Sequence, residues 1–161
     1  LTDKTKDEWD RAFGYMKGFD FQKGVSDLQS TISHARKVDG CSGKVGTVGF
    51  CLGGSLAYMT GFSTDSDASV GYYPVQIEGN IDKAKGAKKP VMLHIAEKDA
   101  FCPPAAQKQI KDGVAGNKLF TVHTYLGADH AFARTGGEHY DKSAADLAGQ
   151  RTLEFLKKNL G

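Results

Sequence analysis

The hydrophobic positions of the chain follow two helical patterns before the first strand-like pattern. Apolar residues recur at spacings of three and four over 6–17 and again over 21–35. Asp20 provides a helix N-cap before the second segment, and Asp39-Gly40 ends its pattern. Two amphipathic helices are therefore predicted at the start of the chain.

The rest of the chain alternates between short apolar, β-branched runs and helical spacing. The runs predict strands at 44–50, 68–73, 90–96 and 120–126, and the helical spacing predicts helices at 53–62, 105–114 and 143–159. The lysine- and glycine-rich stretch before 90–96 is predicted to be a loop. Strands that alternate with helices are typical of the α/β class, so we expect a mostly parallel β-sheet covered by helices on both faces.

The first predicted strand, 44–50, is apolar on both faces, which is typical of a strand inside a parallel sheet. A sheet that began with this strand would leave one of its edges unpaired. No repeat or linker divides 1–161. We therefore expect a single domain whose N-terminal part is incomplete.

Composition and charge narrow the classes of function. The 161 residues are 40% hydrophobic and 25% charged, values that exclude a disordered chain. Lys and Arg number 21 against 19 Asp and Glu, and this dispersed net charge of +2 does not favour nucleic acid as a partner. No apolar run approaches the roughly 20 residues of a membrane span. We expect a cytoplasmic monomer that acts on a small molecule, with neither a membrane nor a nucleic-acid partner.

A glycine-rich hexapeptide carries the clearest chemical signal. Gly49-Phe50-Cys51-Leu52-Gly53-Gly54 lies between a predicted strand and a predicted helix, and it matches the nucleophile elbow G-x-Nuc-x-G with cysteine as nucleophile. The glycines permit a tight turn, which places the thiol at a helix N-terminus and lets the Leu52 N–H face a developing oxyanion. Alternatively, the glycines serve close packing alone and the cysteine is an inert buried residue.

An acid and a histidine follow two of the later predicted strands. Asp99 comes after 90–96 and His130 comes after 120–126. Because the carboxyl ends of parallel strands lie at one edge of a sheet, both side chains are expected on the edge that holds Cys51. Nucleophile, acid and histidine then occur in the chain order of the α/β-hydrolase fold, which predicts a Cys51-His130-Asp99 triad.

Three segments resemble the dienelactone hydrolase (carboxymethylenebutenolidase) family. They are GFCLGG around Cys51, HIAEKDAFCPP around Asp99 and GADHAFART around His130. The likeness begins near Lys17, and GKVG, VGYYPV and RTLEFL extend it to the last helix. It implies the C-terminal two-thirds of an α/β-hydrolase fold and a hydrolase that opens a cyclic enol-lactone, dienelactone, to give maleylacetate.

The resemblance also implies roles for individual residues. Cys51 would form a thioester that water cleaves, His130 would hold the thiol proton, and Asp99 would fix the imidazole tautomer. Arg134 matches the family arginine that binds the substrate carboxylate. The position of a second family arginine holds Trp9, with Arg11 as the nearest candidate substitute. No metal or organic cofactor is implied, and a resting-state glutamate and one oxyanion donor have no counterpart in this chain.

Other aromatic, cysteine and histidine residues are weaker candidates. Phe132, between His130 and Arg134, is expected to bind substrate. Four further aromatics near strand ends are candidates for a pocket or for the core: Tyr72, Tyr73, Phe101 and Tyr140. The remaining cysteines and histidines, which form no metal-binding spacing, are expected to be structural: Cys41, Cys102, His34, His94, His123 and His139.

Two other functions remain open at this point. A broader carboxylesterase or lactonase of the same fold would turn over neutral esters with little dependence on Arg134. An inactive binding fragment would keep the cleft without a reactive Cys51.

Overall fold

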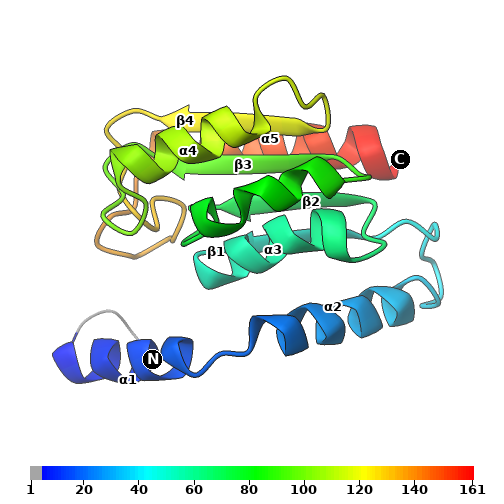
Figure 1. Ribbon diagram of the computed structural model, residues 1–161, viewed down its shortest axis with the longest axis horizontal. Helices are drawn as coiled ribbons and strands as arrows, with labels where there is room; N and C mark the ends of the chain where they lie inside the picture. The colour runs from blue at the N-terminus through cyan, green and yellow to red at the C-terminus, as the bar shows by residue number, and fades with distance from the viewer. Residues whose placement is uncertain (1–4) are drawn as a thin grey trace.

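Four parallel strands form the sheet at the centre of the molecule (Figure 1). The computed structural model describes residues 5–161. The strands are β1 (Gly46–Phe50), β2 (Ala68–Tyr72), β3 (Val91–Ala96) and β4 (Phe120–Tyr125), and their order in the sheet follows the chain. The register pairs Val48 with Val70 and Val70 with Met92. The predicted parallel sheet is confirmed, with strand ends within two residues of those expected.

Helices cover both faces of the sheet, as predicted. On one face, β3 contributes Val91 and Leu93 to a core shared with α3 (Leu52–Ser63), α4 (Pro104–Val114) and the 3-10 stretch η1 (Glu78–Gly86). On the other face, Met92 and Ala96 pack in a core shared with α5 (Lys142–Leu160). Every residue of β3 is buried, because alternate side chains enter the two cores.

The expectation of a plain loop before β3 is wrong, since η1 lies there. The segment has low mean hydropathy and no clear helical spacing, so local pattern gives little sign of it. Ala84 of η1 is fully buried against the α4 side of the core. Tertiary packing therefore stabilises this turn where local sequence does not.

Two helices precede the sheet. α2 (Phe21–Ala35) is capped by the Asp20 side chain, packs against α3 and buries Ile32. α1 (Lys6–Lys17) contains no buried residue, and Figure 1 shows it beyond the end of α2, away from the layers that cover the sheet. Of the two, α2 belongs to the packed body and α1 is attached to it loosely.

β1 forms one edge of the sheet within residues 5–161. Val48 and Phe50 of this strand remain 45% and 50% exposed, whereas β2 next to it is buried throughout. The apolar sequence of β1 is thus only partly covered by the residues described.

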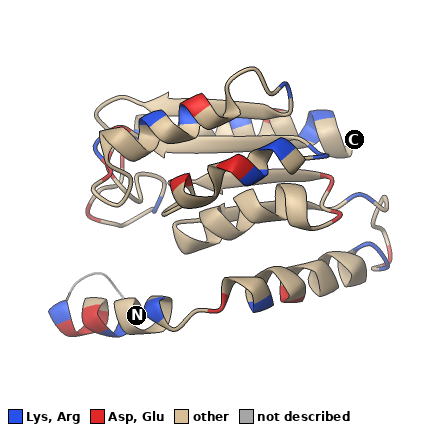
Figure 2. Cartoon of the chain, in the orientation of Figure 1, with Lys and Arg blue, Asp and Glu red and all other residues tan. Residues whose placement is uncertain are grey.

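Charged residues of both signs occur along α1, α2 and α4 (Figure 2). Several form lysine–aspartate pairs one helical turn apart, such as Lys6 with Asp10 and Lys23 with Asp27. No helix in the described part of the chain has the length and apolarity needed to cross a bilayer.

Candidate active site

The candidate nucleophile, Cys51, is the single residue between β1 and α3. The strand ends at Phe50, the helix begins at Leu52, and Cys51 between them has φ 55° and ψ −120°. A positive φ is strained for a residue with a side chain, and such strain is typical of functional turns. The Cys51 N–H donates to the Tyr72 carbonyl at 3.1 Å, which ties the turn to the neighbouring strand.

Close backbone packing explains two of the three elbow glycines. A Cβ on Gly49 would lie 1.9 Å from the Gly53 carbonyl oxygen, and a Cβ on Gly54 would lie 2.5 Å from the Tyr72 oxygen. A Cβ on Gly53 would meet nothing within 4 Å, so packing does not require a glycine at this position.

The carboxyl ends of all four strands meet around Cys51. Tyr73 follows β2, Asp99 follows β3 and His130 follows β4, so each loop brings one side chain to the same edge of the sheet. Leu52 lies in the first turn of α3, where backbone N–H groups have no partner within the helix. Its predicted role as an oxyanion donor is compatible with this position.

Asp99 and His130 form a buried hydrogen-bonded pair. His130 Nδ1 lies 2.8 Å from Asp99 Oδ2, and Asp99 is only 2% exposed. The other carboxylate oxygen, Oδ1, accepts the Phe101 N–H at 2.8 Å. With both oxygens engaged, Asp99 is held in one orientation, and its Oδ2 faces Nδ1 of the imidazole.

The electrostatics of His130 favour its charged form. Burial acts against an imidazolium, but hydrogen bonds to Asp99 and to Cys51 outweigh it and raise the pKa of His130 to about 9. Two rings also hold the imidazole edge-to-face: Tyr73 with centroids 5.0 Å apart and Phe101 with centroids 4.8 Å apart. The site therefore combines a fixed histidine, a buried acid and an adjacent thiol.

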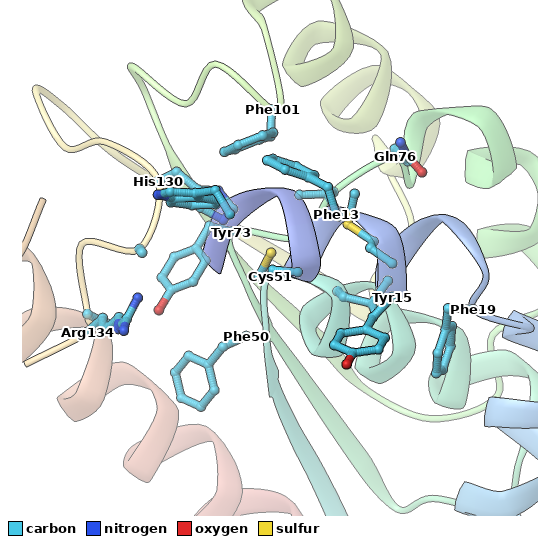
Figure 3. Close-up of a pocket in the computed structure, with 17 residues that line it drawn as sticks. Phe13, Tyr15, Phe19, Phe50, Cys51, Tyr73, Gln76, Phe101, His130 and Arg134 are labelled. Carbon is cyan, nitrogen blue, oxygen red and sulfur yellow. The ribbon is translucent and has the colours of Figure 1, made fainter. Parts of the chain in front are cut away.

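A cavity of about 710 Å³ opens onto Cys51 and His130 (Figure 3). Its walls come from α1, from the β1–α3 turn and from the loops after β2, β3 and β4. Most of the side chains that line it are apolar or aromatic, and among the described lining residues Arg134 is the one Lys or Arg. Its lining includes Trp9, Phe13, Tyr15, Phe50, Cys51, Leu52, Tyr73, Gln76, Phe101, His130 and Arg134.

Two predicted substrate-binding residues do not reach this cavity. Phe132 is fully buried and packs on Tyr73 and Tyr125, so the expectation that it binds substrate is wrong. It lies in a core beneath the site, while its neighbours Ala131 and Ala133 face the cavity.

Arg11 is exposed and is not among the residues that line the cavity. Five other residues of the same helix do line it: Trp9, Ala12, Phe13, Tyr15 and Met16. Arg11 is therefore wrong as a substitute for the second family arginine, and Trp9 itself occupies the wall.

The weaker candidates separate into cavity and core. Tyr73 and Phe101 line the cavity, whereas Tyr72 is buried with its hydroxyl 2.6 Å from Thr152 Oγ1. Tyr140 is not among the lining residues.

The expectation of a structural Cys102 is confirmed, since the residue is buried in the core. Burial, and then the charges of Asp99 and Glu78, raise the pKa of Cys102 to about 12. His94 is likewise buried, between Tyr125 and Thr152.

Sequence reasoning missed the double role of Phe101. Its backbone N–H positions Asp99 and its ring packs on His130. The available signal was its place two residues after an aspartate, where an Asx turn forms readily.

Comparison with known proteins shows which family this chain belongs to. The dienelactone hydrolase family model matches residues 2–160. The chain belongs to the dienelactone hydrolase family. A carboxymethylenebutenolidase of Pseudomonas putida is 40% identical over 147 residues, covering 91% of this chain and 62% of that protein. A relative from Azospirillum brasilense is 42% identical and is covered to 69% of its length. The chain thus spans about two-thirds of these dienelactone hydrolase relatives.

Solved structures agree with the α/β-hydrolase fold of the family. A Klebsiella pneumoniae structure superposes with a TM-score of 0.82 at 22% identity, over 89% of this chain and 64% of that one. The dienelactone hydrolase-like promiscuous phosphotriesterase P91, from metagenomic libraries, superposes with a TM-score of 0.77 at 18% identity, over 100% of this chain and 70% of its own. At these identities the likeness supports the fold alone.

Proposed function

We propose that this chain carries the catalytic centre of a cysteine-dependent carboxylic-ester hydrolase that opens a cyclic enol-lactone. The observation that carries the proposal is the buried His130–Asp99 pair, 2.8 Å apart, together with a strained Cys51 that lines the same cavity as His130. The substrate class is supported by relatives named carboxymethylenebutenolidase. In that reaction a dienelactone becomes maleylacetate.

The geometry suggests the order of proton transfers. His130, whose charged form the site favours, holds the proton of the Cys51 thiol, and the sulfur attacks the lactone carbonyl, whose developing oxyanion accepts the Leu52 N–H. The C–O bond of the ring breaks, the leaving enolate takes the proton from His130, and a thioester remains. His130 then takes a proton from water, the hydroxide adds to the thioester, and the thiolate leaves.

Each supporting residue has one task in this scheme. Asp99 stabilises the imidazolium and fixes its orientation without taking the proton itself. The hydrogen bond from Phe101 keeps Asp99 in place. Arg134, at the cavity wall, binds the substrate carboxylate through its guanidinium. The scheme assigns every step to side chains and backbone of this chain and requires neither metal nor organic cofactor.

We further propose that the chain works on its small-molecule substrate as a cytoplasmic monomer without a nucleic-acid partner. The mixed surface charge supports the last point, and three free cysteines suit a reducing compartment.

Hydrolysis of a dienelactone by the chain and by its Cys51→Ala variant tests this function. We expect the variant to lose turnover by about 1,000-fold or more, because the nucleophile is gone. Cys41→Ala is the matched control, since that thiol lies outside the cavity, and its rate should stay within about twofold. A Cys51→Ala variant that hydrolyses the lactone at the original rate would refute the cysteine mechanism.

A broader carboxylesterase or lactonase is the second candidate, favoured by the largely apolar cavity wall. Arg134→Ala separates the two functions when a dienelactone and a neutral activated ester are assayed in parallel. The enol-lactone hydrolase should lose about 100-fold on the anionic substrate and little on the neutral one. A loss of less than about threefold on both would favour the esterase.

An inactive binding fragment predicts no turnover of either substrate. It also predicts that iodoacetamide alkylates Cys51 no faster than Cys41. A chain that meets both conditions would overturn the enzymatic proposal.

A further inference from the structure

Three aromatic rings form a continuous row from α1 to the candidate general base. The Trp9 and Phe13 rings stack with centroids 5.5 Å apart and an interplanar angle of 25°, and Phe13 lies 6.1 Å from Phe101. Phe101 in turn contacts His130. Figure 3 shows the Phe13 and Phe101 rings next to each other at the cavity. We call Trp9, Phe13 and Phe101 the aromatic wall.

The aromatic wall leaves much apolar surface for a ligand. Its three side chains line the cavity and remain 39%, 40% and 39% exposed, even though each contacts another ring. Flat apolar surface of this kind is favourable to bury, and aromatic rings prefer to meet other rings in offset or edge-to-face contact. A planar apolar group placed against the aromatic wall would cover this surface.

The cationic side chain of the cavity, Arg134, lies apart from the aromatic wall. In Figure 3, Arg134 lies apart from Phe13 and Phe101, with Tyr73 between them in this view. Neither Asp nor Glu occurs among the described lining residues, and no Lys or Arg lies in the aromatic wall. The cavity therefore offers a cation at one side, a large apolar surface at the other, and Cys51 between the walls.

We propose that the aromatic wall binds an aryl group of the substrate. The chain then prefers esters or lactones that carry one carboxylate and an aryl group to small lactones that carry a second carboxylate in place of the aryl group. Because Phe101 packs on His130, which would protonate the leaving oxygen, the aryl group lies on the leaving-group side of the scissile bond. This inference rests on the proposed hydrolase function and names the substrate class of the same site.

Ligand binding to the Cys51→Ala variant tests the aromatic wall without any catalytic step. Trp9 is the single tryptophan of the chain, so its fluorescence reports directly on the wall. The probes are 3-phenylpropanoate, with one carboxylate and one ring, and glutarate, a small dicarboxylate. We expect 3-phenylpropanoate to bind about tenfold more tightly than glutarate and to change the Trp9 emission.

Two further substitutions in the Cys51→Ala background make the test specific. Phe13→Ala should weaken 3-phenylpropanoate by about tenfold and glutarate by less than about twofold, because only the aryl group meets the ring. Since α1 buries no residue, this change leaves the core intact, which circular dichroism can verify. Tyr140→Ala, an aromatic residue outside the cavity lining, is the matched control and should change neither affinity.

Trp9→Arg, followed by calorimetry because the fluorophore is lost, should reverse the preference toward glutarate. Equal affinities of the Cys51→Ala chain for the two probes would overturn the proposal. So would no detectable binding of either probe, or an equal loss of both affinities in Phe13→Ala.

The proposed function fails by a separate result, full dienelactone turnover by Cys51→Ala. That result would leave the binding preference of the aromatic wall unaffected.

Discussion

The sheet and α1 contribute to the same cavity in opposite ways. Asp99 and His130 lie on loops that follow β3 and β4; hydrogen bonds hold Asp99, and a hydrogen bond and two packed rings hold His130. Trp9 and Phe13 stand on a helix without a buried residue and remain well exposed. Groups that must keep a productive geometry are attached to the packed body, whereas a surface that only has to cover an apolar group can lie on a weakly packed helix.

The largest expected effect lies on the sheet side of this comparison. Asp99→Asn should cut lactone turnover by about 1,000- to 10,000-fold, because the amide no longer stabilises the imidazolium or selects its tautomer. The substitution is nearly isosteric, so the circular dichroism spectrum should not change. A variant with a near-normal rate would remove Asp99 from the proposed triad.

Stability should differ just as clearly between the core under the site and α1. Phe132→Ala should lower the free energy of unfolding by about 3–5 kcal/mol, because it opens a cavity between Tyr73 and Tyr125. Tyr15→Ala on α1 should change it by less than about 0.5 kcal/mol, since Tyr15 is 67% exposed. Urea denaturation of both variants measures the contrast, and similar losses would show that α1 is part of the cooperative core.

Within the elbow, two glycines should respond differently to the same added methyl group. Gly49→Ala forces a Cβ against the Gly53 carbonyl and should destabilise the chain by about 3 kcal/mol, with loss of activity. Gly53→Ala meets open space and should be neutral, or stabilising by about 0.5–1 kcal/mol, through its higher helix propensity. Thermal unfolding and lactone turnover are the readouts, and equal effects would contradict the packing argument.

The smallest expected effect concerns pH. Burial first, then the charges of His123 and Arg151, lower the pKa of His94 to about 3. In the unfolded chain this histidine titrates near 6.5, so the stability it contributes is complete above pH 6.5 and is lost as the pH falls toward 3. The loss should reach about 2 kcal/mol between pH 6.5 and 4.5.

Urea denaturation of His94→Gln across this range checks the pH effect. The variant should be less stable at pH 7, because contacts with Tyr125 and Thr152 are altered, but its stability should fall less steeply with acid. His139→Gln, at an exposed site, should keep the original slope.

The stability that His130 contributes changes with pH in the opposite direction. Since its pKa is raised to about 9, its contribution to stability is complete below pH 6.5 and is lost as the pH rises through 9.

One result would contradict the prediction for His94. If the stability of His94→Gln falls with acid as steeply as that of the unmodified chain, His94 does not cause the acid sensitivity.

Much of the framework could be predicted from local patterns. The β-branched runs and the helical spacing located the four strands and five α-helices of residues 5–161, because side-chain period reflects which faces are buried. The glycines around Cys51 indicated a tight turn, and the chain order of cysteine, aspartate and histidine placed them at one sheet edge. These features depend on neighbours in sequence or on the general geometry of parallel sheets.

What local patterns could not provide was the direction of side chains in loops and the packing of separate elements. Phe132 lies between two cavity-lining residues yet points into the core, because Tyr73 after β2 and Tyr125 of β4 pack against it. Local pattern also does not show that α1 contributes Trp9, and not Arg11, to the cavity lining. A one-dimensional pattern records burial and turn chemistry, whereas contacts between distant segments are set by how their surfaces fit once the sheet has formed.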